Sequence, residues 1–466
     1  MDLTLKRSPI SMPTSTPTSF RLTTVTERTD WKLADIFIRL GSCSPGIKAI
    51  TASTGPAKDV PNSAKSNRPY QLPALTGVRF FLALWVVCYH QAGPNGAIGP
   101  WLTQSPLLLA NLVHTGYVAV SVFFVLSGFI LAYNYSLETW LSRKQLARFA
   151  IARFARIYPV YLLGVLAAVV LFGFQMQRIR SLLMAFGLVQ AWDPATALSW
   201  NAPGWSLSDE AFFYLCFPFV GVLLWRLRGP LKWIGVMAAI WLLSLLVPVF
   251  LTVSGQGYGP ASAFGASQPG APALDHFLMN FSRFNPAVRL PEFCMGILIC
   301  KCWLFLKETN HFLYNRGSWL YLPSVAVIVG VLLWAGDLPY LPVHNSLLLP
   351  FFGCLILGLA LQGGTLAAFL SHPWLMFLGQ ASYAIYILHQ PILRFMSTAA
   401  GGIFTPRGLP GMSAYLLVVL ITASGAFKLV EEPMNKLLKT RLGNWLDRHL
   451  PAASPKTLNT DFVPSG

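Results

Sequence analysis

The chain has 466 residues, 54% of them hydrophobic and only 11% charged, and its formal net charge is +17 at pH 7. Because so few charged residues cannot cover a soluble globule of this size, the composition and a mean hydropathy of +0.54 exclude a soluble enzyme and indicate a polytopic membrane protein. The basic residues lie in short clusters beside apolar segments, as in loops that face anionic lipid headgroups, so nucleic-acid binding is not predicted.

The N-terminal residues 1–70 are rich in Ser, Thr, Pro and basic residues, and they lack the apolar core of a good signal peptide. We expect them to form a basic, mostly disordered cytoplasmic tail. A transmembrane domain over 71–433 and a basic cytoplasmic C-terminal tail over 434–466 are expected to follow.

Ten apolar runs are long enough to cross a bilayer. They lie at 73–92, 116–135, 157–174, 205–225, 233–253, 286–305, 319–335, 345–362, 373–397 and 412–430. An eleventh run, at 181–192, is too short and is interpreted as a re-entrant or interfacial helix. The predicted fold is an all-α polytopic membrane protein, a bundle of about ten transmembrane helices plus this short helix.

The distribution of Lys and Arg predicts the orientation of the bundle. With the N-terminus inside, the internal loops carry 11 basic residues and the external loops carry 4. This bias places both termini in the cytoplasm. The largest external loop, near 254–285, is rich in Gly, Pro, Ser and Ala.

Two ionisable side chains interrupt the first apolar run, Arg79 and His90. Eleven helical residues make about three turns, so both side chains lie on one helix face, roughly 16 Å apart along the axis. Ionisable residues at membrane depth are costly and usually face a polar cavity. The pair is therefore the first candidate for a functional site.

Seven segments in chain order resemble the acyltransferase-3 family of integral membrane O-acyltransferases. They are Arg79 with His90, GYVAVSVFFVLSGFILA with Phe123, Phe124, Ser127 and Gly128, RFARIYPVY with Arg153 and Arg156, PGWSLSDEAFFYL, RLPEFCMG (Arg289 to Gly296), SYAIYILHQP (Ser382 to Pro391) and EEP (Glu431 to Pro433). Asp209 stands where the family more often has an apolar residue. The resemblance implies a ten-helix enzyme of a bacterial inner or plasma membrane that transfers acyl groups to sugars and other hydroxyl compounds.

Acyl transfer from a thioester to an alcohol needs a base for the hydroxyl proton, and His90 fits that role. A covalent acyl-histidine is the alternative route. Arg153 and Arg156, one helical turn apart, fit the phosphates of acyl-CoA, although inside loops also need basic anchors. Arg79 lies deeper and is expected to contact the pantetheine end of the donor or to orient His90.

Further site residues are predicted on three spans. Glu210, beside Trp205 and Ser206, is expected to orient His90 or bind acceptor hydroxyls, the alternative being a structural ion pair with an arginine. Only one of Asp209 and Glu210 is expected to face the cavity. The others are Ser127, for which helix packing with Gly128 is favoured over a site role, and the series Tyr383, Tyr386 and His389 on the acceptor side. For His389 a structural role is an equal alternative.

Arg289 and Glu292, three residues apart, are expected to neutralise each other. The histidines in loops and at span ends, His276 and His344 among them, receive no role. Seven cysteines without a CxxC pair predict neither a disulfide framework nor a metal site.

The sequence thus predicts a membrane O-acyltransferase that moves a small acyl group, most simply acetyl, from cytoplasmic acyl-CoA to a hydroxyl of an extracytoplasmic or membrane-associated glycan or glycolipid. Acyl-CoA would be a co-substrate, with no permanently bound cofactor. The alternative is a membrane transporter or a proton or solute relay, against which the lack of paired halves argues.

Overall fold

The computed structural model describes residues 72–135, 137, 142–173, 178–255, 259–261, 273–399 and 406–450. The predicted N-terminal tail and the last part of the predicted C-terminal tail lie outside these residues. Within the described part the chain is helical, and the β pairing is limited to one isolated bridge between Pro260 and Pro339. The predicted all-α class is confirmed.

The first half of the described chain runs from residue 72 to the end of a long helix at residue 253. Its elements are α2 (Pro73–His90), α3 (Gly99–Leu102), α4 (Leu107–His114), η1 (Gly116–Val118), α5 (Ala119–Asn134), α6 (Arg143–Phe172), α7 (Ile179–Phe186), η3 (Gln190–Trp192), η4 (Ala202–Gly204), α8 (Trp205–Trp225) and α9 (Pro230–Val253). Helix α6 begins at a capping box, in which Ser142 and Gln145 exchange hydrogen bonds.

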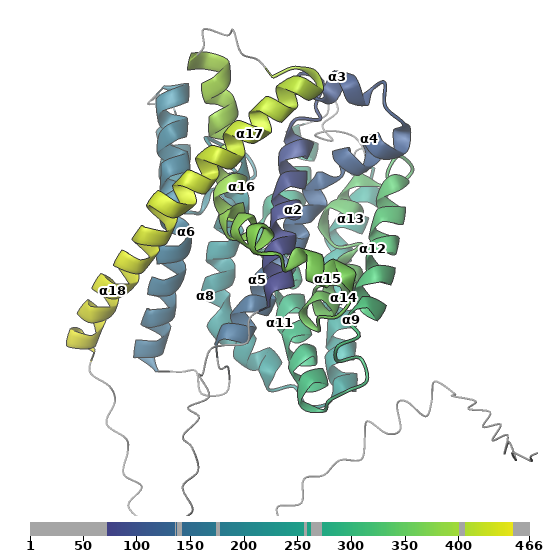
Figure 1. The fold of residues 1–466 in the computed structure, drawn as a ribbon, viewed down its shortest axis with the longest axis vertical. Helices are drawn as coiled ribbons and strands as arrows, with labels where there is room; N and C mark the ends of the chain where they lie inside the picture. Colours follow the sequence, from purple (N-terminus) through teal and green to yellow (C-terminus); the bar gives the residue numbers. More distant parts are fainter. Residues whose placement is uncertain are drawn as a thin grey trace, which may run out of the picture. The chain divides into compact units, whose positions relative to one another are not determined.

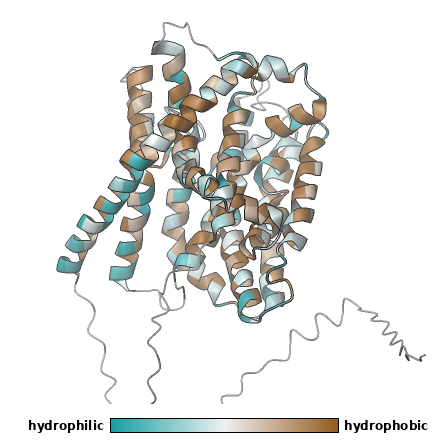
Figure 2. Ribbon diagram, in the orientation of Figure 1, coloured by the Kyte–Doolittle hydropathy of each residue, from teal (hydrophilic) through white to brown (hydrophobic). Residues whose placement is uncertain are grey.

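The second half contains the helices that complete the bundle. They are α10 (Ala273–Phe284), α11 (Pro286–Glu308), α12 (Ser318–Leu333), α13 (Tyr340–Asn345), α14 (Leu349–Ala360), α15 (Thr365–Leu370), α16 (Pro373–Ala399), α17 (Gly408–Ala426), η5 (Phe427–Glu431) and α18 (Glu432–His449). Helix α18 contacts α6 along the edge of the bundle seen in Figure 1. Apolar residues cover most of the helices, and hydrophilic residues gather at the lower ends of α6 and α18 (Figure 2).

Seven helical stretches of the described chain are long and apolar enough to cross a membrane. They are Pro73–His90, Leu107–Asn134, Arg143–Phe172, Ala202–Trp225, Pro230–Val253, Tyr340–Ala360 and Gly408–His449. The other three predicted spans coincide with α11, α12 and α16. Helix α12 has only 16 residues, and α11 carries buried charges, so the predicted number of ten spans is not confirmed.

The short apolar run at 181–192 forms two pieces, α7 and η3, rather than a long helix. Its eight-residue α7 is too short to cross a bilayer, as predicted. The predicted loop at 254–285 needs a correction, because its last part folds as the helix α10. Apolar residues at 274, 277, 278 and 281 recur at helical spacing, and this periodicity was a signal that the Gly- and Pro-rich composition obscured.

Glycines let two helix pairs approach closely in the centre of the bundle. A Cβ atom on Gly128 of α5 would lie 2.0 Å from the carbonyl oxygen of Phe293 on α11, and one on Gly296 would lie 2.0 Å from that of Val125. Helices α2 and α16 also approach closely, because a Cβ on Gly379 would lie 2.0 Å from the carbonyl oxygen of Thr76. Close backbone contact through small residues is the usual way membrane helices pack, and it confirms the packing role predicted for Gly128.

Candidate active site

Three cavities follow one another through the interior of the bundle. The first, of about 130 Å³, lies beside the first half of α6 and is called the arginine cavity because Arg79, Arg153 and Arg156 line it. The second, the middle cavity of about 60 Å³, shares Arg79 and Glu210 with the first. The third, the histidine cavity of about 330 Å³, contains His90 and shares Tyr386 with the middle cavity.

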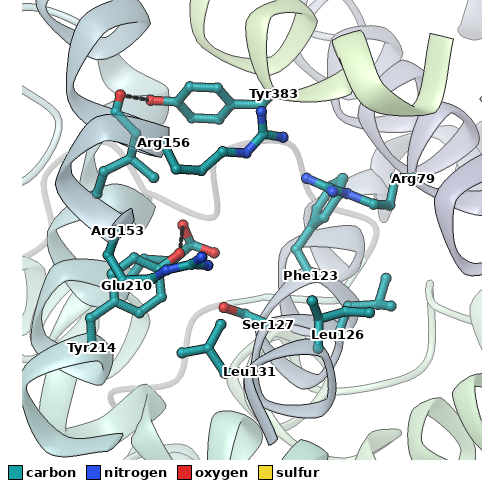
Figure 3. A pocket seen from close by; sticks show the side chains of 12 residues that line it. Arg79, Phe123, Leu126, Ser127, Leu131, Arg153, Arg156, Glu210, Tyr214 and Tyr383 are labelled. Atoms are coloured by element: carbon teal, nitrogen blue, oxygen red, sulfur yellow. Dashed lines mark hydrogen bonds between the residues drawn. The ribbon is translucent and has the colours of Figure 1, made fainter. Parts of the chain in front are cut away.

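The arginine cavity collects cations from two helices. Figure 3 shows the side chains of Arg79, from α2, and Arg156, from α6, extending toward one another across it. Arg156 forms an ion pair with the fully buried Glu431 of η5. Arg153 lies over the ring of Tyr135 and donates a hydrogen bond to its hydroxyl at 3.3 Å. The position of these guanidinium groups, one helical turn apart on α6, suits the recognition of an anion.

Glu210 supplies the carboxylate of the arginine and middle cavities. Its Oε2 accepts a hydrogen bond from the hydroxyl of Tyr214 at 3.1 Å (Figure 3). No arginine nitrogen of the described residues lies within 4.0 Å of it, so the structural ion pair considered as the alternative is not formed. The neighbouring Asp209 lies outside the three cavities, as expected if only one of the two acids faces them.

The middle cavity is the smallest of the three. Phe123 and Tyr383 line it together with Ser206, whose Oγ lies 2.9 Å from the hydroxyl of Tyr386. The hydroxyl of Tyr383 donates to the backbone carbonyl of Ile157. Ser127 lines the arginine cavity, so it has a place at the site although its neighbour Gly128 serves packing.

His90 ends α2 and stands in the wall of the histidine cavity, with the fully buried His389 of α16 behind it. Nε2 of His389 lies 3.0 Å from Nδ1 of His90, and Nδ1 of His389 lies 2.8 Å from the backbone carbonyl of Tyr386. A carbonyl can only accept, so Nδ1 of a neutral His389 carries the proton and its Nε2 accepts one from His90. This network assigns the proton of His90 to Nδ1 and leaves a lone pair on Nε2.

One of the two roles predicted for Glu210, orienting the imidazole of His90, does not match the contacts. The ring partner of His90 is His389 and the hydrogen-bond partner of Glu210 is Tyr214, whereas the binding of acceptor hydroxyls by Glu210 stays a prediction. The two groups line different cavities, because His90 lies at the end of α2 whereas Glu210 lies one turn and a half inside α8.

The sequence model of the acyltransferase domain family matches residues 72–430, which contain every residue that lines the three cavities. The chain belongs to this acyltransferase family. It is 30% identical over 405 residues to the acyltransferase MdmB of Streptomyces mycarofaciens, a match that covers 80% of this chain and 94% of MdmB. No solved structure matches the chain.

Two further relatives are O-acetyltransferases. The chain is 23% identical over 411 residues to the O-acetyltransferase OatA of Staphylococcus aureus, which covers 81% of this chain and 60% of OatA. The peptidoglycan O-acetyltransferase OatA of Listeria monocytogenes is 25% identical over 411 residues, covering 80% of this chain and 57% of that protein. The chain thus spans less than two thirds of the OatA proteins. It is an enzyme of the membrane O-acyltransferase class.

The acyltransferase has site residues that sequence reasoning missed. Helix α10 brings His276, Asn280 and Arg283 to the histidine cavity, and α13 brings His344. Trp205, predicted as a cavity residue, lines the same cavity and packs against Phe284 of α10 with ring centroids 4.8 Å apart. Aromatic faces beside polar side chains are suited to a sugar or another polyhydroxyl acceptor.

A buried ion pair supports that wall. Nη2 of Arg289 lies 3.1 Å from the carboxylate of Glu292, and both side chains are fully buried, which confirms the predicted neutralising pair. Arg289 also donates to Ser121 Oγ at 2.9 Å, to Asn345 Oδ1 at 3.1 Å and to the backbone carbonyl of His344 at 3.2 Å. These bonds join α5, α11 and α13 and hold His344 at the cavity.

Among the described residues, no group of three or more His, Cys, Asp or Glu side chains is arranged to hold a metal ion. The six described cysteines are free thiols.

Proposed function

We propose that this acyltransferase moves a small acyl group, most simply acetyl, from cytoplasmic acyl-CoA to a hydroxyl of an extracytoplasmic or membrane-associated glycan or glycolipid. The observation that carries the proposal is the row of three cavities, which links a cluster of three arginines to His90 through shared lining residues. The proposal includes ten membrane spans with both termini in the cytoplasm, which the bias of Lys and Arg supports. It also includes a bacterial inner or plasma membrane, which the bacterial relatives support.

The donor would enter the arginine cavity. Arg79, Arg153 and Arg156 place three positive charges around it, against the carboxylates of Glu210 and Glu431. One guanidinium group can donate two parallel hydrogen bonds to phosphate oxygens. A cavity with more arginines than carboxylates therefore suits the phosphates of coenzyme A. In the proposed orientation this cavity opens toward the cytoplasm, where acyl-CoA is made, because α6 begins there.

The acyl group would pass from the arginine cavity into the middle cavity. With a volume of about 60 Å³, the middle cavity is the smallest of the three and suits a short acyl group carried on the pantetheine arm. Phe123 and Tyr386 line it. Its small size supports acetyl rather than a long acyl chain.

His90 would act as the general base in the histidine cavity. Its Nε2 takes the proton of the acceptor hydroxyl while that oxygen attacks the thioester carbonyl carbon. The tetrahedral intermediate then expels the coenzyme A thiolate, which receives the same proton from Nε2, so that one ester forms and one thioester breaks. His389 holds the Nδ1 proton of His90 throughout, and so keeps Nε2 available.

An acceptor assay tests the proposal. Membranes that contain the acyltransferase or its His90→Ala variant receive acetyl-CoA labelled in the acetyl group and candidate glycans. We expect the variant to lose at least about 100-fold in rate, the usual contribution of a general base. Equal labelling by both proteins would remove His90 from the mechanism.

A further inference from the structure

A fourth cavity, of about 340 Å³, adjoins the histidine cavity. It is called the Arg178–Arg394 cavity after the two arginines that line it, one just before α7 and one in the last turns of α16. Leu198 and Ala202 line both this cavity and the histidine cavity. A molecule that occupies the Arg178–Arg394 cavity therefore lies next to one that reaches His90.

Each of the two guanidinium groups lies over an aromatic ring. The Cζ atom of Arg178 lies 4.5 Å from the ring centroid of Trp200, and that of Arg394 lies 5.2 Å from the centroid of Phe172. A cation–π contact of this kind restrains a guanidinium group and leaves its N–H groups available to a ligand. Both arginines are thus arranged as donors.

The positive charge of this cavity is not neutralised by the described part of the chain. No described carboxylate lies within 4.0 Å of Arg178 or Arg394, and no acidic residue lines the cavity. The nearby Arg180 differs, because its Nη2 pairs with Asp193 at 2.9 Å. The remaining polar lining, Gln390 and Ser397, can donate hydrogen bonds to an anion as well.

The backbone under Arg178 adopts an unfavourable conformation. Trp200 has φ +64°, in the left-handed region that a bulky side chain rarely adopts. Its indole N–H donates to Ser181 Oγ at 3.1 Å, which holds the ring beneath Arg178. Strain of this kind persists where the surrounding structure requires it, and it is concentrated at binding sites.

Membrane topology gives no reason for these arginines. In the proposed orientation they lie toward the outer side, where basic residues are scarce and do not anchor the chain. Val170 of α6 and Phe395 of α16, close in the chain to the lining residues Phe172 and Arg394, are 81% and 58% exposed and offer an apolar surface there. A ligand that suits both features has an anionic group and a hydrocarbon chain.

We propose that the Arg178–Arg394 cavity binds the phosphate group of a lipid-carried acceptor and thereby places its glycan in the histidine cavity. The inference deepens the proposed function and rests on it for the position of the reacting hydroxyl. Guanidinium groups form charge-assisted hydrogen bonds to phosphate oxygens, and an uncharged lipid headgroup cannot form bonds of this strength.

A binding experiment tests the site without depending on catalysis. The full-length protein, in nanodiscs of phosphatidylcholine, is titrated with a polyprenyl phosphate, with the uncharged polyprenol and with phosphatidylglycerol, and bound lipid is measured by native mass spectrometry. We expect the phosphate to bind at least 10-fold more tightly than polyprenol. The Arg178→Gln/Arg394→Gln variant should lose this preference, and the matched control Arg180→Gln should keep it.

Three results would overturn the inference. The first is equal binding of polyprenyl phosphate and polyprenol. The second is an unchanged preference for the phosphate in a double variant whose thermal melting matches that of the wild type. The third is binding of phosphatidylglycerol as tight as that of polyprenyl phosphate, which would make the site one for ordinary lipid headgroups. Titrations repeated on His90→Ala separate the two proposals. The preference for polyprenyl phosphate should persist in that variant. A failure of the acyl-transfer proposal would therefore leave the binding result intact, and a failure of the binding result would leave the acyl-transfer proposal intact.

Discussion

His90 and His389 stack with ring centroids 5.0 Å apart, and a hydrogen bond of 3.0 Å joins Nδ1 of the first to Nε2 of the second. They are separated by 299 residues in the chain and belong to α2 and α16. Because the backbone carbonyl of Tyr386 orients His389, the pair forms a chain of hydrogen bonds that ends at the lone pair of His90 Nε2.

The first prediction concerns His389 as a positioning residue. His389→Ala should lower kcat about 10- to 100-fold with little change in KM for acetyl-CoA, because His90 loses the acceptor that fixes its tautomer. His389→Gln should restore part of the rate, since a side-chain amide can accept from His90 and donate to the carbonyl of Tyr386. Steady-state rates with acetyl-CoA check both. A purely structural role would be indicated if the Gln variant were as slow as the Ala variant at equal thermal stability.

The second prediction concerns the donor side. Arg153→Ala should raise KM for acetyl-CoA about 10-fold with a smaller change in kcat, because one charge-assisted contact to a phosphate is lost. Rates measured over a range of acetyl-CoA concentrations test this. Arg148→Ala, which removes an exposed arginine of the same helix that pairs with Asp447, is the matched control. Equal KM values for both variants would exclude Arg153 from donor binding.

The third prediction separates binding from stability at Arg156. Arg156→Ala leaves the fully buried carboxylate of Glu431 without its ion pair. We expect a loss of up to about 3 kcal/mol in the free energy of unfolding, less than for a fully buried pair because 26% of the Arg156 side chain is exposed. The double variant Arg156→Ala/Glu431→Gln should regain part of the stability but none of the donor affinity. Thermal melting in detergent and KM measurements decide this.

The fourth prediction concerns the acyl chain. Phe123→Ala widens the middle cavity, so the ratio of butyryl to acetyl transfer should increase about 10-fold, a change of the size expected for one or two methylene groups. Competition between the two labelled donors measures the ratio. Phe219→Ala serves as the control because Phe219 is 71% exposed on the outside of α8. The same ratio in both variants would show that the middle cavity does not select the acyl group.

The fifth prediction tests helix packing. Gly128→Ala should destabilise the protein by about 1–3 kcal/mol, because its new methyl group would overlap the carbonyl oxygen of Phe293 and force α5 and α11 apart. Gly330→Ala should not, since nothing lies within 4 Å of a Cβ at that position of α12. Melting temperatures of the two variants check the difference. Equal melting temperatures would argue against close contact of α5 and α11.

Much of the architecture follows from the sequence by itself. Apolar runs determine where helices lie, because a bilayer-crossing segment must satisfy its backbone hydrogen bonds internally, and every predicted span is helical. Helical periodicity, a local property, was also enough to place Arg79 and His90 on one face of α2, and both line the row of cavities. The charged residues inside apolar runs identified most of the site.

Only the tertiary structure decided which faces meet. The pairs His90 with His389 and Arg156 with Glu431, and the wall that α10 adds to the histidine cavity, join segments far apart in the chain. Membrane helices share similar apolar surfaces, so hydropathy does not distinguish one neighbour from another, and small residues and buried polar groups at particular contacts select the partners. For that reason the sequence determined the helices and their ionisable residues, whereas the packing of the helices determined how those residues combine into a site.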